Sequence, residues 1–125
     1  MSNGQSNLIG ILQERVESLF DEGKIEEAQR VAQTALDSAR RSVDSDAENL
    51  PQLITALETL GDLRRHLGDP TSAEALYGEA IEYLQDGGDL AQIARIESSL
   101  AGIYDFAQRE EEAIPLYEHA IELFE

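Results

Sequence analysis

The sequence contains no cysteine, no tryptophan, only three prolines and no long hydrophobic run. Without cysteine the chain has no disulfide framework, no thiolate nucleophile and no cysteine-based zinc or iron–sulfur site. The apolar run Leu8–Leu12 is short, contains Gly10 and follows no basic residues. We therefore expect no signal peptide and no membrane span, and a location in the cytoplasm.

Positive charge is also scarce. The chain has 9 Lys and Arg residues against 26 Asp and Glu, which gives a formal net charge of −17. Nucleic acids and anionic membrane surfaces are excluded as partners, because both need clustered basic residues. The 125 residues are 42% hydrophobic, enough to form a core, and they correspond to one domain or a short repeat array.

The hydrophobic residues that are present recur at steps of three and four. This spacing is typical of an amphipathic helix and not of a strand, whose side chains alternate. The clearest stripe consists of Leu53, Leu57, Leu60, Leu63 and Leu67. The pattern predicts six antiparallel helices, at about 6–22, 25–43, 50–67, 70–85, 90–107 and 110–124.

Residues that end or begin helices separate these segments. Gly23 and Gly68 stand where a helix closes in a left-handed conformation that glycine adopts at little cost. Asp69-Pro70 opens the next helix, because Asp accepts from free backbone N–H groups and Pro is tolerated at the first helical position. Gly87-Gly88-Asp89 is expected to act in the same way, and Asp44-Ser45-Asp46 is expected to form a loop.

The sequence repeats itself. The block 74–82 and the block 114–122, forty residues later, are versions of one motif, Ala or Pro-Leu-Tyr followed by Ala-Ile-Glu. A backward shift of 45 residues gives a weaker third copy that keeps the glycine and the small residues. Ala28, Ala73 and Ala113 correspond to one another and are expected at close contacts between paired helices.

The spacing of these residues resembles the tetratricopeptide repeat: Leu60-Gly61, then Gly68-Asp69, then Ala73, Tyr77 and Ala80. The forty-residue period and the run Ala113–Tyr117 resemble the long-repeat branch that includes the kinesin light chain. Gln108-Arg109 departs from the pattern at the last turn. The resemblance implies an all-α fold in which three helix-turn-helix repeats form a short right-handed solenoid. Its expected boundaries are a disordered tail at 1–5 and repeats at about 6–43, 47–85 and 89–125.

In this family the first helices of the repeats line a concave groove that holds a peptide, so the resemblance also implies a binding surface. Acidic residues in the groove favour a basic partner, although they are equally compatible with a surface that is acidic everywhere. The candidate groove residues are Glu17, Glu58, Thr59, Asp62, Arg65, His66, Arg95, Ser99 and Asp105.

Motifs for catalysis, phosphate binding or metal binding are absent from the sequence. His66 and His119 are expected to be solvated surface residues. The segment Asp44–Glu48 lacks the glycine and the terminal glutamate of a calcium loop, so it is interpreted as a polar linker. We therefore predict no enzymatic activity, no cofactor and no metal.

The predicted function is an adaptor that binds a protein or peptide segment, with a structural self-assembly module as the alternative. The second possibility rests on the last helix, which is apolar on two sides. Ile114, Tyr117 and Ile121 are expected to pack on the preceding helix. The other side is expected to pair two copies in a homodimer, or to meet the next repeat of a longer protein; its residues are Leu116, Ala120, Leu123 and Phe124.

Overall fold

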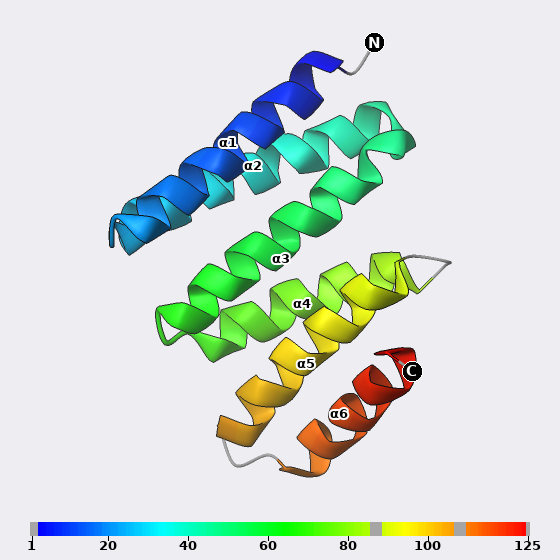
Figure 1. The fold of residues 1–125 in the computed structure, drawn as a ribbon. Coiled ribbons are helices and arrows are strands. Elements are labelled where there is room, and N and C mark those ends of the chain that lie inside the picture. The colour runs from blue at the N-terminus through cyan, green and yellow to red at the C-terminus, as the bar shows by residue number, and fades with distance from the viewer. Residues whose placement is uncertain (1–2, 86–88, 107–109, 125) are drawn as a thin grey trace.

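The structure, a computed structural model, describes the backbone over residues 3–85, 89–106 and 110–124. Side chains are described over the same residues except 3–7, 104–106, 110–111 and 113. This part of the chain contains six α-helices, one short 3-10 helix and no strand (Figure 1). In chain order they are α1 (Asn3–Asp21), α2 (Ile25–Ser45), η1 (Ala47–Asn49), α3 (Leu50–His66), α4 (Pro70–Leu84), α5 (Leu90–Phe106) and α6 (Glu110–Phe124).

The predicted helices are present, but some of their ends differ. Helix α1 begins at Asn3, so residues 3–5 of the expected disordered tail are helical. Extending an existing helix by one turn adds a hydrogen bond per residue fixed, and the polar residues there do not prevent it. Helix α2 continues through Ser45, so the predicted loop at 44–46 reduces to a single extended residue, Asp46.

The predicted turn chemistry is found in the first two helix pairs, whose turns the structure describes. Gly23 and Gly68 have φ angles of 78° and 82°. At each turn the glycine N–H donates to the carbonyl three residues before it, and the next N–H donates to the carbonyl five residues before it. The carboxylate of Asp69 then accepts from the N–H of Ser72, and that of Asp89 accepts from the N–H of Ala91. Residues 87 and 88 lie outside the described part.

The burial of the side chains reproduces the forty-residue period. Over 51–61 and 91–101 the order of buried, partly buried and exposed residues is the same at all eleven positions. In the second helices Ala28 and Ala73 are both fully buried, while the side chain of Ala113 lies outside the described residues. Of the predicted leucine stripe, only Leu67 is exposed, because it follows the last residue of α3.

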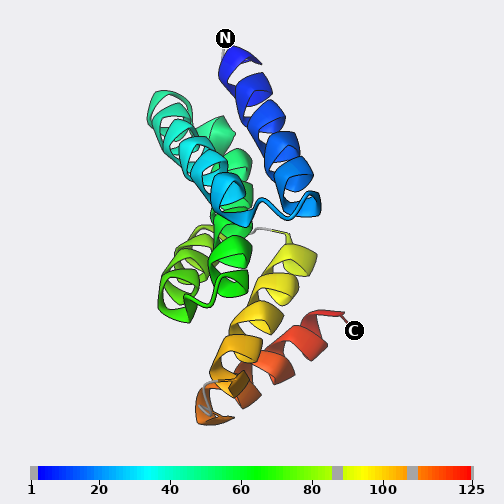
Figure 2. The same cartoon turned by 90° about the vertical axis from the view of Figure 1, so that its left-hand side faces the viewer.

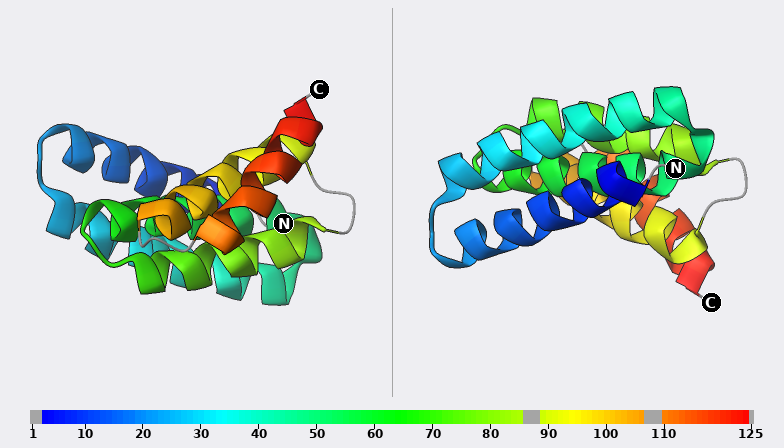
Figure 3. Two further views of the ribbon diagram at one scale, coloured as in Figure 1. Left: turned by 90° about the horizontal axis from the view of Figure 1, so that it is seen from below. Right: turned by 90° about the horizontal axis from the view of Figure 1, so that it is seen from above.

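The helices form a stack of three pairs, and α1, α3 and α5 follow one another in a row (Figure 2). Helices α2 and α4 lie on one side of this row, which we call the outer side. The views along the stack show that α6 departs from this order, because its C-terminal end lies on the other, inner side (Figure 3). The all-α class and the solenoid of helical pairs are thus confirmed, with an irregular last helix.

Close approach of α3 and α4 depends on the absence of a side chain at Gly61. A Cβ atom at this position would lie 2.8 Å from Cε1 of Tyr77, whose ring is fully buried in the core. Tyr77 cannot withdraw without opening a cavity, because Ala73 and Ala80 on the same helix face are also fully buried. The Leu-Gly pair of the repeat therefore has a steric cause.

Gly61→Ala is expected to lower the free energy of unfolding by about 1–3 kcal/mol, the usual cost of overpacking a core. Gly78→Ala is the matched control, since a Cβ at Gly78 of α4 would have no atom within 4 Å. It is expected to stabilise the chain by up to about 1 kcal/mol through helix propensity. Urea unfolding followed by circular dichroism measures both, and equal gains in stability would contradict the packing argument.

Candidate peptide-binding groove

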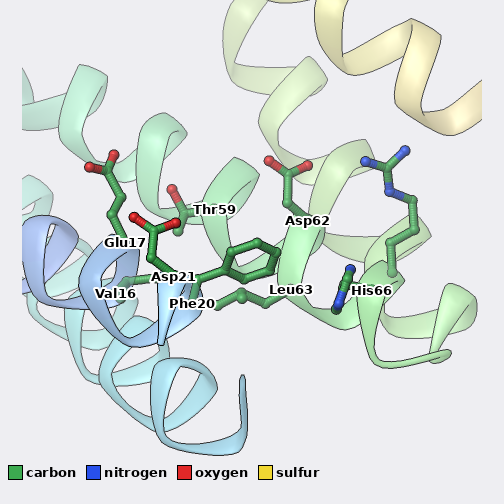
Figure 4. Close-up of a pocket in the computed structure, with 9 residues that line it drawn as sticks. Val16, Glu17, Phe20, Asp21, Thr59, Asp62, Leu63 and His66 are labelled. Atoms are coloured by element: carbon green, nitrogen blue, oxygen red, sulfur yellow. The ribbon is translucent and has the colours of Figure 1, made fainter. Parts of the chain in front are cut away.

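The inner face of α1 and α3 borders a cavity. Its volume is about 500 Å³, and it opens between the C-terminal halves of the two helices (Figure 4). We call it the acidic cavity. Its lining residues are Val16, Glu17, Phe20, Asp21, Thr59, Asp62, Leu63, Arg65 and His66.

The acidic cavity has a charged side and an apolar floor. Figure 4 shows the carboxylates of Glu17, Asp21 and Asp62 on one side, with Phe20 and Leu63 beneath them. Glu17 and Asp21 lie four residues apart on α1, so their like charges face the same direction. Three carboxylates and one guanidinium therefore line the cavity, so its acidic side chains outnumber its basic ones.

Asp62 is held in place by Tyr77 of the second helix. The Tyr77 hydroxyl donates a short hydrogen bond to the Asp62 carboxylate. Partial burial raises the pKa of Asp62, and the hydrogen bond from Tyr77 opposes this shift. Burial, followed by the hydrogen bond to Asp62, also raises the pKa of Tyr77, so the hydroxyl remains a neutral donor. Asp62 is consequently oriented before any ligand arrives.

Glu58 and Arg95, two of the predicted ligand-binding residues, bind each other. Nε and Nη2 of Arg95 on α5 donate to the two carboxylate oxygens of Glu58 on α3, at 2.6 and 2.9 Å. Gln92 also donates to Glu58, whose side chain is only 13% exposed. The hydrogen bond from Arg95 to Glu58 raises the pKa of Arg95. This arrangement connects the second and third repeats, so we assign Glu58 and Arg95 to the stack and not to the free binding surface.

The other predicted groove residues are divided among several environments. Glu17, Thr59, Asp62, Arg65 and His66 meet in the acidic cavity, as the repeat register predicts. Ser99 lies further along the groove, where its hydroxyl donates to the backbone carbonyl of Arg95. The side chain of Asp105 lies outside the described residues.

Neither histidine is simply solvated. The ring of His66 packs edge-on against Phe20, with ring centroids 5.0 Å apart. Nδ1 of His119 on α6 lies 2.5 Å from a carboxylate oxygen of Glu97, whose side chain is 7% exposed. Glu97 occupies the position that corresponds to buried Leu57 one repeat earlier. A charged residue at a predicted core position was the only sequence signal for this pair.

The two apolar sides of α6 are reversed relative to the prediction. Ala120 is buried, and Leu116 and Leu123 pack against the core, although they were expected to form an open interface. The side expected to pack on α5 is exposed instead, and Phe124 is 65% exposed. Because the helix is apolar on both sides, its sequence alone does not determine which side faces α5. The exposed residues are Ile114, Tyr117, Ile121 and Phe124.

The sequence analysis missed the apolar floor of the acidic cavity, formed by Val16, Phe20 and Leu63. These residues are part of the helix stripes and were indistinguishable from core residues. Phe20 shows the difference, because it remains 40% exposed at the edge of the cavity. In the sequence, this part of the site could have been found from Phe20, an aromatic residue at the exposed edge of its helix stripe.

Comparison with known families agrees with this architecture. The tetratricopeptide repeat family model matches residues 8–86 and, again, residues 52–125. The two matches overlap over the middle pair of helices, as expected for a model that slides along a repeat array. The chain therefore belongs to the tetratricopeptide repeat family. A search of the curated proteins finds no match.

Membership of this family defines the coarse function. Tetratricopeptide repeats generally mediate protein–protein interactions and scaffolding, and the family is typically non-enzymatic. Over the residues that the structure describes, no helix has the length and apolarity needed to cross a membrane. The same residues contain no group of three or more side chains suited to hold a metal ion.

If Glu58 and Arg95 hold the repeats together, their effects on stability will be coupled. Glu58→Gln and Arg95→Met are each expected to destabilise the chain, and a double-mutant cycle should give a coupling free energy of about 0.5–1 kcal/mol. The coupling should decrease in 1 M salt, because Arg95 is exposed. Urea unfolding of the four proteins measures it. Additive effects in low salt would show that the pair does not contribute to the stack.

Proposed function

We propose that this protein is an adaptor that binds a basic segment of another protein in the groove formed by α1 and α3. The observation that carries the proposal is the acidic cavity, in which three carboxylates lie over an apolar floor. A segment that combines basic and apolar residues matches both parts of this surface.

The electrostatic argument concerns Glu17, Asp21 and Asp62. Like charges four residues apart on a helix are mildly destabilising, so a cation placed between Glu17 and Asp21 relieves their repulsion. The net charge of −17 adds a long-range attraction that accelerates the approach of basic partners. Arg65, which also lines the cavity, offsets only part of this field.

The apolar floor of the acidic cavity offers a contact for the methylene groups of a basic side chain. Lys and Arg bury their methylene groups along apolar surfaces while the charged end stays in a polar environment. Val16 and Leu63 supply such a surface, and the ring of Phe20, which is 40% exposed at the edge of the cavity, extends it. An acidic peptide gains neither contribution.

The proposal is tested with a labelled twelve-residue peptide of repeated Lys-Ser-Leu and its Glu-Ser-Leu counterpart. In low salt the basic peptide is expected to bind and the acidic one is not. Glu17→Gln with Asp21→Asn should weaken binding about tenfold, since each charge contributes a fraction of a kcal/mol to about 1 kcal/mol. Fluorescence anisotropy measures the affinities.

The matched control removes two charges outside the groove. Asp44 and Glu82 are exposed on α2 and α4, which lie on the outer side. Asp44→Asn with Glu82→Gln changes the net charge by the same amount and is expected to alter binding less than twofold, an effect of long-range field alone. Equal losses in both double variants would mean that the surface is merely acidic everywhere and that the cavity is not the site.

A second candidate function is self-assembly through α6. Its exposed side carries four large apolar residues at helical spacing, which is typical of a surface that contacts another protein. Two copies meeting face to face about a two-fold axis would bury this side twice. We therefore keep the homodimer as a proposal, with Ile114, Tyr117 and Ile121 in its interface in place of Leu116, Ala120 and Leu123. Phe124 stays in the interface, as predicted from sequence.

Light scattering of the chain at rising concentration tests this candidate. A dimer is expected, and Ile121→Glu with Phe124→Glu should shift it to monomer, because charged side chains cannot be buried against their copies without a large desolvation cost. Ile11→Glu is the control, since Ile11 on α1 is equally exposed but distant along the chain. A monomer at every concentration would remove self-assembly as a function of this surface.

A further inference from the structure

The last helix does not pack like its counterpart in the preceding repeat. Leu84 of α4 is buried and Tyr83 is exposed, whereas forty residues later Phe124 is exposed and Leu123 packs against the core. Helix α6 is therefore turned about its axis relative to α4, so that neighbouring side chains have exchanged roles. We call the observed arrangement the turned position, and an arrangement of α6 like that of α4 the register position.

The surface of α3 that receives Tyr77 is altered at both matching positions of α5. Gly61 leaves room for the Tyr77 ring, and Asp62 accepts the hydrogen bond from its hydroxyl. The third repeat has Ala101 and Gly102 at these positions. Ala101 carries the Cβ atom that, at Gly61, would lie 2.8 Å from Cε1 of Tyr77, and Gly102 has no side chain to accept a hydrogen bond. A tyrosine of α6 therefore cannot pack on α5 as Tyr77 packs on α3.

Tyr117, the residue of α6 that matches Tyr77, accordingly lies outside this place. Its side chain is exposed, whereas that of Tyr77 is fully buried. Three ring atoms of Tyr77 lie within 3.2 Å of the Cβ position of Gly61. At Gly102 the nearest such atom is the Tyr117 hydroxyl oxygen, at 4.0 Å. The wedge of an aromatic ring against a glycine, which joins α3 to α4, is thus missing between α5 and α6.

A buried hydrogen bond favours the turned position. Glu97 of α5 is buried at the position that matches Leu57, and Nδ1 of His119 lies 2.5 Å from its carboxylate. The residue of α4 that matches His119 is Glu79, which is bonded instead to Arg40 of α2. In the register position His119 would likewise point toward the preceding repeat. Glu97 would then be buried without this partner, which is costly for a carboxylate.

Apolar burial by itself favours the register position. That position covers Tyr117 and Phe124, whereas the turned position covers Leu116 and Leu123. The two aromatic side chains are larger, and the stabilisation from burial grows with the apolar area removed from water. The turned position is therefore not selected by α6 itself, and residues of α5 have to exclude the alternative.

We propose that Glu97, Ala101 and Gly102 are positioning residues that turn α6 and thereby create its exposed apolar side. The inference rests on the second candidate function, because this side is the proposed dimer interface. It adds the cause of the exposure: the third repeat lacks the place for an aromatic ring and carries a carboxylate that needs His119. With the residues of the second repeat at these three positions, α6 packs in the register position and its apolar side is closed to a second copy.

The test gives the third repeat the residues of the second, in the full chain with Glu97→Leu, Ala101→Gly and Gly102→Asp. By NMR, the Tyr117 ring is expected to gain nuclear Overhauser contacts with the backbone of position 101 and to lose its relaxation by a soluble paramagnetic agent. The Leu123 methyl groups should become more accessible to that agent. A Tyr117 ring that stays exposed would overturn the proposal. Loss of helical circular dichroism would also overturn it, since the register position is a packed one.

Truncation distinguishes the two positions by a second measurement. In the native chain Tyr117→Ala is expected to lower the melting temperature less than Leu123→Ala, because Leu123 packs against the core and Tyr117 is exposed. In the triple variant the order should reverse, because the Tyr117 ring is then the buried one. The same order in both backgrounds would contradict the proposal.

Gly102→Ala is the matched control. It changes the same part of α5 but supplies neither room for a ring nor a hydrogen-bond acceptor, and its Cβ atom would lie in ordinary contact with the Tyr117 hydroxyl. We expect Tyr117 to stay exposed and the melting temperature to rise through helix propensity. A Tyr117 ring that becomes buried in this control would show that the three positioning residues are not the cause.

The Tyr117 measurements separate this inference from self-assembly, which light scattering follows. If Tyr117 becomes buried in the triple variant while association persists, the positioning role stands and self-assembly through α6 fails. If association is lost while Tyr117 stays exposed, the positioning role fails and the candidate interface is judged by its own variants, Ile121→Glu with Phe124→Glu.

Discussion

The fold depends on the close approach of the two helices within each repeat. Small residues make this approach possible, because Ala28 and Ala73 occur in full burial at matching positions and Gly61 admits the ring of Tyr77. The same ring extends to the inner face, where its hydroxyl orients Asp62. A residue that packs in the core thus also orients a charged residue of the groove.

Most of the fold was predictable because it is encoded locally. Helix stripes, turn glycines and the cap at Asp69 each depend on residues within a few positions of one another, and the forty-residue repeat adds the pairing of the helices. The ends that were missed have the same origin. No local signal prevents α1 from beginning at Asn3 or ends α2 before Ser45, so both helices are longer than predicted.

The site was predictable as a face of the array but not as a set of free side chains. The repeat register placed Glu17 and Asp62 on one surface correctly, whereas the pairing of Glu58 with Arg95 depends on the angle between neighbouring repeats, which no spacing in the sequence specifies. Helix α6 is the clearest case. Two apolar sides compete for α5, and the choice of Leu116 and Ala120 is made by packing in three dimensions.

Two ion pairs connect neighbouring repeats on opposite sides of the stack. On the outer side Arg40 of α2 donates to both carboxylate oxygens of Glu79 on α4, and on the inner side Arg95 of α5 does the same to Glu58 of α3. The ion pair between the first and second repeats therefore lies on the outer side, and the one between the second and third repeats lies on the inner side. Bending that opens the outer edge separates Arg40 from Glu79, and bending that opens the inner edge separates Arg95 from Glu58. The two junctions therefore resist bending through ion pairs on opposite sides of the stack, and added salt weakens both pairs.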